Sequence, residues 1–101
     1  MTAPVFDETI HNPVRLRACA MLAGLDHAAF PVLRDELGVS DSVLSKHLAT
    51  LEAAGYVRLA KATSDRRLRT AVALTSEGRA AYAAHVAALR SIVGAATLST
   101  G

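Results

Sequence analysis

The sequence predicts a mainly α-helical domain with one small β-hairpin. Alanine, which favours helices and lets them approach closely, occurs 21 times among the 101 residues. Apolar residues recur at helical spacing through most of the chain, but they alternate with polar residues between Val57 and Leu74, as in a half-buried strand. A chain of this length holds one domain with one modest core. We expect that domain to span residues 5–96, followed by a disordered tail of residues 97–101.

The first helix is predicted from Pro13 to about Ala23. Asn12 provides a capping side chain, and Pro13 fits the first helical position because its missing N–H has no helical partner there. Apolar residues lie all round this helix, which indicates that it does not lie on the surface of a monomer. Leu16 and Met21 are therefore expected at an interface with a second copy of the chain.

A helix, a tight turn and another helix are predicted over residues 31–54. Pro31 suits the first turn of the earlier helix, and Gly38 is placed to end it in the left-handed conformation. Ser40 is a favoured N-cap for the later helix, which continues to about Ala54. Three leucines at spacings of four and three form the buried stripe of that helix: Leu44, Leu48 and Leu51.

The alternating segment that follows is predicted to be a β-hairpin from about Val57 to Leu74, with a polar and cationic tip. On its second strand, one face carries Arg67 and Arg69 and points outward. The opposite face is predicted to point inward and consists of Leu68, Thr70, Val72 and Leu74.

A long last helix is predicted from Thr75 or Ser76 to about Val93. Few of its residues are charged, and its apolar residues recur at spacings of three and four, so it is expected to pack against a partner helix. The apolar row consists of Tyr82, Val86, Leu89 and Val93.

This order of elements is that of a winged helix-turn-helix. In such a domain the second helix of the turn motif enters the major groove of DNA, and the hairpin, or wing, lies beside the backbone and the minor groove. The charge distribution agrees with that reading. Residues 42–70 carry six basic and two acidic side chains, a net charge of +4, whereas the rest of the chain has a net charge of −2.

Three segments resemble known families. The stretch "LGVSDSVLSKHLATLEAAGYV", residues 37–57, resembles the recognition segment shared by the MarR-like and ArsR-like bacterial transcription regulators. The stretch "SDRRLRTAVALTSEGRAAY" resembles the MarR wing and its exit into the last helix, and "NPVRLRACAMLAG" resembles the first helix of ArsR proteins. The resemblance implies a compact winged-helix regulator of transcription.

The helix after Ser40 offers short polar side chains and one cation on its outward face. Hydroxyl groups and a lysine reach phosphates or base edges, and a valine can pack on a thymine methyl group. The alternative is a solvated helix face, and His47, near the leucine stripe, is expected to be structural or to contact a phosphate. Asp41 is expected to stabilise the helix start. The candidate contacts are Ser40, Ser42, Val43, Ser45, Lys46 and His47.

The wing offers four basic side chains, and arginine suits the negative potential of a narrow minor groove. The resemblance implies that Asp65 orients Arg67. The alternative is a soluble hairpin whose charges protect its edges. Arg34, next to two acidic residues, is expected to form a surface ion pair. The candidate DNA contacts of the wing are Lys61, Arg66, Arg67 and Arg69.

Together these features predict a sequence-specific regulator of transcription, a repressor, that binds double-stranded DNA as a homodimer. The first and last helices would form the dimer and place the two recognition helices about 34 Å apart on a pseudo-palindromic operator. The alternative is a winged-helix module that docks another protein without specific DNA binding. The candidate dimer contacts are Leu16, Met21, Tyr82, Val86, Leu89 and Val93.

Other kinds of chemistry have weak support in the sequence. The four histidines have no metal-ligand spacing, and the single cysteine, Cys19, is expected to be a core residue. There is no nucleophile elbow and no phosphate-binding glycine loop. We therefore expect a cytoplasmic protein without enzymatic activity, metal, cofactor or membrane contact. A small organic effector is left open as a partner.

Overall fold

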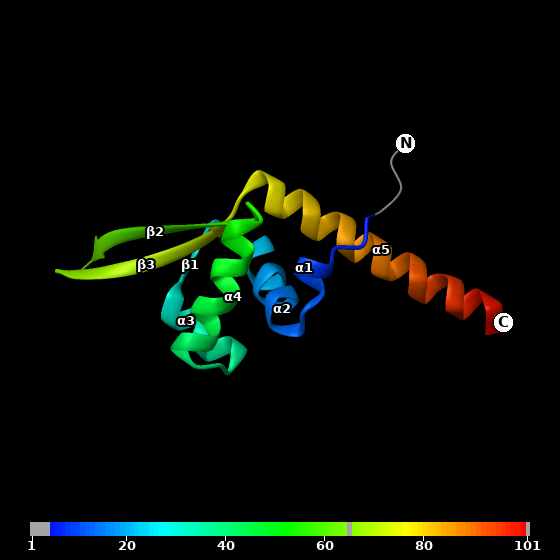
Figure 1. The fold of residues 1–101 in the computed structure, drawn as a ribbon, viewed down its shortest axis with the longest axis horizontal. Helices are drawn as coiled ribbons and strands as arrows, with labels where there is room; N and C mark the ends of the chain where they lie inside the picture. The colour runs from blue at the N-terminus through cyan, green and yellow to red at the C-terminus, as the bar shows by residue number, and fades with distance from the viewer. Residues whose placement is uncertain (1–4, 65, 101) are drawn as a thin grey trace.

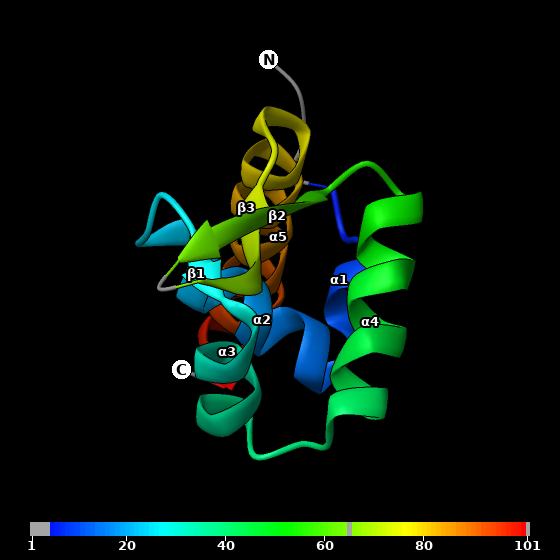
Figure 2. The same ribbon diagram turned by 90° about the vertical axis from the view of Figure 1, so that its left-hand side faces the viewer.

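The hairpin and the last helix project from opposite ends of a small helical body (Figure 1). This computed structural model describes residues 5–64 and 66–100. Figure 2 looks along the hairpin and shows α4 on one side of it and α3 below it. In chain order the elements are α1 (Glu8–His11), α2 (Pro13–Ala23), β1 (Ala28–Ala29), α3 (Phe30–Leu37), α4 (Asp41–Ala53), β2 (Val57–Ser64), β3 (Arg67–Leu74) and α5 (Ser76–Thr100).

Local capping signals set the bounds of α2 and α3. The Asn12 side-chain oxygen accepts hydrogen bonds from the N–H groups of Val14 and Arg15, at 3.0 and 3.2 Å, so α2 begins where the sequence predicts. α3 ends at Gly38, which has a φ of 68°, a conformation that glycine adopts without the strain of a Cβ. The resulting tight turn leads directly into α4.

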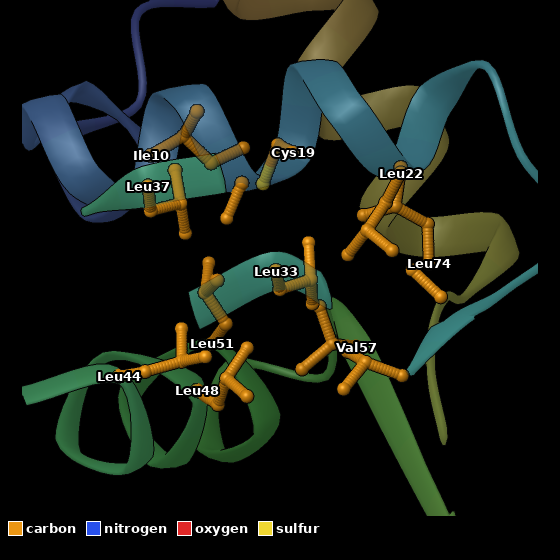
Figure 3. Close-up of a cluster of buried hydrophobic side chains, with 13 residues drawn as sticks. Ile10, Cys19, Leu22, Leu33, Leu37, Leu44, Leu48, Leu51, Val57 and Leu74 are labelled. Carbon is orange, nitrogen blue, oxygen red and sulfur yellow. The ribbon is translucent and has the colours of Figure 1, made fainter. Parts of the chain in front are cut away.

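The leucine stripe of α4 anchors this helix to the core. Leu44, Leu48 and Leu51 are fully buried, and they point toward side chains of α1, α2 and α3 (Figure 3). Burial raises the pKa of the Cys19 thiol on α2 to about 11, so that thiol remains protonated and unreactive at neutral pH. The predictions of the stripe and of a core cysteine are confirmed. The facing side chains are Ile10, Cys19, Leu22, Leu33 and Leu37.

The hairpin belongs to an antiparallel sheet with the strand order β1-β3-β2. Val57 pairs with Leu74 at its base, and Ser64 pairs with Arg67 at its far end. Val57 and Leu74 are buried, but Leu68, which was predicted to point inward, is 67% exposed. That prediction was wrong because the hairpin extends past the body. The alternation sets the face on which Leu68 lies, but no core packs against that face near the tip.

Three features of the backbone differ from the predictions. Neither α1 nor β1 was predicted. Elements of one turn or two residues are too short to show a periodicity. α5 continues to Thr100, so its predicted end near Val93 was too early, and residues 97–100 are helical where a tail was expected. Alanines 95 and 96 favour this continuation. The domain limits of 5–96 stay a prediction.

The start of α5 is locked against the base of the wing. The Thr75 hydroxyl donates to the Gly55 carbonyl at 2.6 Å and accepts from the Gly78 N–H at 2.9 Å. The Thr75 N–H donates to the Tyr56 carbonyl at 3.0 Å. A Cβ at Gly78 would overlap that same carbonyl group. Glycine therefore lets α5 leave the sheet at this close approach.

Candidate nucleic-acid interface

α4 exposes small polar side chains on the face opposite its leucine stripe. Ser42, Val43, Ser45 and Lys46 line a shallow, open depression on the surface, and all four side chains are exposed. The helical spacing predicted this separation of a buried stripe from an outward face. Hydroxyl groups and an ammonium group on one exposed face can bond to phosphates and base edges, and Val43 can contact a thymine methyl group.

Ser40 has a structural task at the start of α4. Its side-chain oxygen accepts a hydrogen bond from the Val43 N–H at 3.2 Å, so it is the predicted N-cap. The same oxygen lies 3.2 Å from the Ser42 hydroxyl oxygen. Ser40 remains exposed, and its hydroxyl therefore joins the end of the polar face that Ser42 begins.

Arg34 connects α3 to the first turn of α4. Its guanidinium donates to the Asp35 carboxylate at 2.9 Å and to the Asp41 carboxylate at 2.8 Å. The prediction that Arg34 is an ion-pair residue is therefore confirmed. Exposed pairs of this kind contribute little to stability, but Asp41 also lies in the first turn of α4, where a carboxylate is favoured by the helix dipole.

His47 lies at the border between the exposed face of α4 and the core, and its side chain is half-buried. Its Nδ1 atom is 2.9 Å from a terminal guanidinium nitrogen of Arg15 on α2. Burial, followed by the positive charges of Arg15 and Lys46, lowers the pKa of His47. The imidazole is therefore held neutral and attached to the body through Arg15.

The register of the wing divides its basic side chains between two faces. Residues that pair across antiparallel strands lie on the same face. Arg69 pairs with Ala62 and Arg58 pairs with Ala73, so Arg58 shares the face of Arg67 and Arg69. Lys61 pairs with Thr70 and lies on the other face. Arg58 is exposed and was missing from the candidate residues. Because side chains alternate along a strand, its place next to the inward-facing Val57 could have revealed that it points outward.

The tip of the wing is a tight turn. Arg66 has a φ of 64°, which is the left-handed conformation that glycine or asparagine usually supplies. Arg66, Arg67 and Arg69 are all exposed, so three guanidinium groups project from the far end of the hairpin. Asp65, which was expected to orient Arg67, lies outside the described residues.

A polar cluster joins the N-terminal segment to α5, and sequence reasoning missed it. The Asp7 N–H donates to Nδ1 of His85 at 2.9 Å, and Nε2 of His85 lies 3.2 Å from Nδ1 of His11. The Tyr56 hydroxyl donates to the Asp7 carboxylate at 2.6 Å, which raises the pKa of Tyr56 to about 12. His85 is fully buried. Phe6 packs on both imidazole rings.

The candidate dimer residues are all at least partly exposed. α5 buries His85 and Ala88 against the body, and its predicted apolar row lies beside these two residues. Tyr82, Val86 and Leu89 are half-buried, and Val93 is 63% exposed. Leu16 and Met21 are half-buried and also pack against the core. A groove of about 460 Å³ follows the row, lined by Ala23, Arg79, Tyr82, Ala83, Val86, Ala87 and Arg90.

Comparison with known proteins identifies the family. Residues 14–93 match the family described as winged helix DNA-binding domain. The chain is also 33% identical over 72 residues to an uncharacterized protein of Methanocaldococcus jannaschii, and the match covers 71% of this chain and 78% of that relative. The chain therefore belongs to the winged helix DNA-binding domain family, as the order of its elements predicted.

Solved structures share the fold. The transcriptional regulator homologue protein from Pyrococcus horikoshii OT3 has a TM-score of 0.83 at 27% identity, with 88% of each chain covered. NadR, solved in complex with 4-hydroxyphenylacetate, has a TM-score of 0.71 at 24% identity, with 93% of this chain and 66% of NadR covered. ZitR from Lactococcus lactis, a zinc-responsive MarR family member, has a TM-score of 0.63 at 17% identity, with 85% and 58% covered. The predicted winged-helix fold is confirmed.

Residues 5–64 and 66–100 offer neither a membrane-spanning helix nor a metal-binding cluster. None of the helices there combines the length and hydropathy that crossing a membrane requires. The same residues contain no group of three or more His, Cys, Asp or Glu side chains that could hold a metal ion. The expectations of no cofactor and no enzymatic activity stay predictions.

Proposed function

We propose that the protein is a sequence-specific regulator of transcription that binds double-stranded DNA. The observation that carries this proposal is the exposed face of α4, where Ser42, Ser45 and Lys46 lie opposite a fully buried leucine stripe in a chain that belongs to a DNA-binding family. In winged helix-turn-helix domains the corresponding helix enters the major groove. Lys46 would bond to guanine acceptors or a phosphate, and the two serines to base edges or phosphates.

The wing would lie at the adjacent minor groove. Arg66, Arg67 and Arg69 are exposed at its far end, and guanidinium groups are attracted to the negative potential of a narrow minor groove. Arg58 shares the face of Arg67 and Arg69 and would contact the phosphate backbone nearer the body. Phosphate contacts of this kind supply affinity that weakens steeply with salt.

The protein would act as a homodimer through α2 and α5. The predicted apolar row of α5 is left partly exposed because His85 and Ala88 occupy the face that packs on the body. A second copy would cover that row, and a two-fold axis there would place the two α4 helices about one turn of DNA apart, roughly 34 Å. Binding to a pseudo-palindromic operator would then repress the gene that it precedes.

Equilibrium binding to duplex DNA tests the proposed surface. Lys46→Ala should weaken binding to a preferred site by about tenfold and relax its base preference. Arg67→Ala should weaken binding to all sequences and reduce the salt dependence by about one counterion. Arg17→Ala removes the same charge from an exposed side chain of α2 that belongs to none of the proposed contact sets, and it serves as the control. If neither Lys46→Ala nor Arg67→Ala differs from Arg17→Ala, the proposed surface is wrong, and a protein-docking module becomes the better interpretation.

A small organic effector is a further part of the proposal. NadR, which has the same fold, was solved in complex with 4-hydroxyphenylacetate, and Tyr82, Arg79 and Arg90 are among the residues that line the groove beside α5 in this chain. An aromatic carboxylate could place its ring on the apolar wall and its charge near a guanidinium group. Thermal unfolding with and without such acids measures this binding. An unchanged midpoint at millimolar ligand would argue against it.

A further inference from the structure

The contact between α2 and α4 determines which nitrogen of His47 carries the proton. A guanidinium group has only donors and keeps its charge at every pH at which proteins fold. The Arg15 terminal nitrogen, 2.9 Å from Nδ1 of His47, must therefore be the donor, and Nδ1 must be the acceptor. A neutral imidazole whose Nδ1 accepts has its single proton on Nε2.

Arg15 is itself fixed on two sides. Its Nε donates to the carbonyl of Thr9 in α1, at 2.5 Å, and its backbone N–H donates to the Asn12 cap at 3.2 Å. The side chain is half-buried. Two hydrogen bonds from the same residue leave little freedom for the terminal nitrogen, so Arg15 presents it to His47 in one position.

Nε2 of His47 is not fully buried. No buried side-chain nitrogen or oxygen of the described residues lacks a hydrogen-bond partner, and the only hydrogen bond of the His47 ring within those residues is made by Nδ1. Nε2 is therefore accessible. The preceding residue of α4, Lys46, is exposed. His47 lies at the edge of the polar face, where a bound duplex would present its backbone.

We propose that Arg15 is a positioning residue, which holds His47 in the neutral form whose Nε2–H donates to a DNA phosphate. This inference rests on the proposed function, and it assigns Arg15 a task that the sequence does not reveal. The hydrogen bond adds affinity without sequence preference, because phosphates carry no direct information about base identity. It also fixes α4 against the backbone, since the donor is tied through Arg15 to α1 and α2.

The charges around His47 affect its protonation, so the proposed contact should depend on pH. Among the described residues, those that act on it are Arg15 from α2 and Lys46 from α4 itself, and both are positive. With Arg15 in place, burial and the two cations lower the pKa of His47, so the ring stays neutral near pH 7. Removal of the Arg15 charge should raise that pKa and let the ring gain a proton in mild acid.

Four proteins test this assignment: the parent, Arg15→Met, His47→Gln and His47→Ala. The first measurement is made on the parent protein itself. Long-range nitrogen–proton NMR correlations of the free protein should show His47 with its proton on Nε2 and none on Nδ1. The Arg15→Met variant keeps an unbranched side chain but has no donor, so a mixture of tautomers is expected. A proton on Nδ1 in the parent overturns the inference even if the variant fails to fold.

DNA binding at matched salt supplies the second measurement. His47→Ala should lose about three- to tenfold in affinity on every duplex, whereas His47→Gln, whose amide keeps a donor near the position of Nε2, should stay within about threefold of the parent. Between about pH 8 and about pH 5.5, Arg15→Met should gain affinity relative to the parent as His47 becomes charged. A merely structural Arg15 would not change this pH profile.

The outcomes separate the two proposals. A parent that binds DNA specifically, together with a His47→Ala variant of equal affinity or an Arg15→Met variant with the parental pH profile, overturns the role of Arg15 and leaves the proposed function standing. A parent with no preference among duplexes at moderate salt overturns the proposed function and, with it, the phosphate contact.

Discussion

Gly78 shows how one residue determines the exit of the chain from the wing. Gly78→Ala would place a methyl group inside the Tyr56 carbonyl, and backbone cannot move aside as a flexible side chain can. We expect a loss of about 3 kcal/mol or more in the free energy of unfolding, measured by urea denaturation. Gly94→Ala is the control. Nothing lies within 4 Å of a Cβ at Gly94, so this variant should gain about 0.5–1 kcal/mol. Equal stability of Gly78→Ala and the parent would contradict the close approach.

His85 gives a prediction of pH dependence at the same scale. Burial, and then His11, lower its pKa from the ordinary value of 6.5, against the opposing charges of Asp7 and Glu8. Below about pH 6.5 the unfolded chain therefore binds a proton that the folded chain does not, so stability falls as the pH decreases. His85 accounts for at most about 1.4 kcal/mol per pH unit of this loss.

The His85→Gln variant removes that titration and should unfold in urea with a shallower loss of stability between about pH 7.5 and about pH 5.5. Some dependence should remain, because the pKa of His47 is also lowered. His27→Gln, which removes an exposed histidine from the loop before β1, is the control. The interpretation fails if the His85→Gln and parent curves are parallel.

Individual residues also show how much of the structure can be predicted from the sequence. The buried positions of Leu44 and Leu48 follow from helical spacing alone, because neighbours on a helix face are three and four residues apart. The bond between Asp7 and His85 joins residues 78 positions apart, and no local pattern indicates such a pair. The contact of Arg15 with His47 spans 32 positions and was missed for the same reason, so His47 was predicted as a candidate DNA contact without this supporting hydrogen bond.

At the scale of elements, alternation along the hairpin predicted its strands and faces but not how far it projects. Leu68 lies on the same face as the buried residues Val72 and Leu74, and only the position of the body determines that it is exposed. Leu68→Ser should therefore change the free energy of unfolding by less than about 0.5 kcal/mol. Leu48→Ala, in the fully buried stripe, should cost about 2–5 kcal/mol in the same urea experiment. A loss of that size at Leu68 would mean that the wing tip is packed in solution.

At the scale of the whole molecule, the proposed dimer is tested by the oligomeric state of the protein in solution. Val93 is 63% exposed, so Val93→Glu should leave the folded monomer intact and disfavour a second copy on α5 by burying a charge. Sedimentation equilibrium at micromolar concentration should show a dimer for the parent and a monomer for the variant. The control is Val32→Glu on α3, where the side chain is 52% exposed and outside the proposed interface. A monomeric parent would rule out the proposed dimer.

Specific DNA recognition by a two-fold arrangement of α4 is tested most directly by selecting bound sequences from random duplex DNA. If two exposed α4 faces are related by a two-fold axis, the selection should enrich a sequence with inverted half-sites whose centres lie about 10 base pairs apart. The same selection with Lys46→Ala should enrich a site with weaker preference within each half and unchanged spacing. A pool that shows no enrichment over its starting composition at moderate salt would contradict sequence-specific binding.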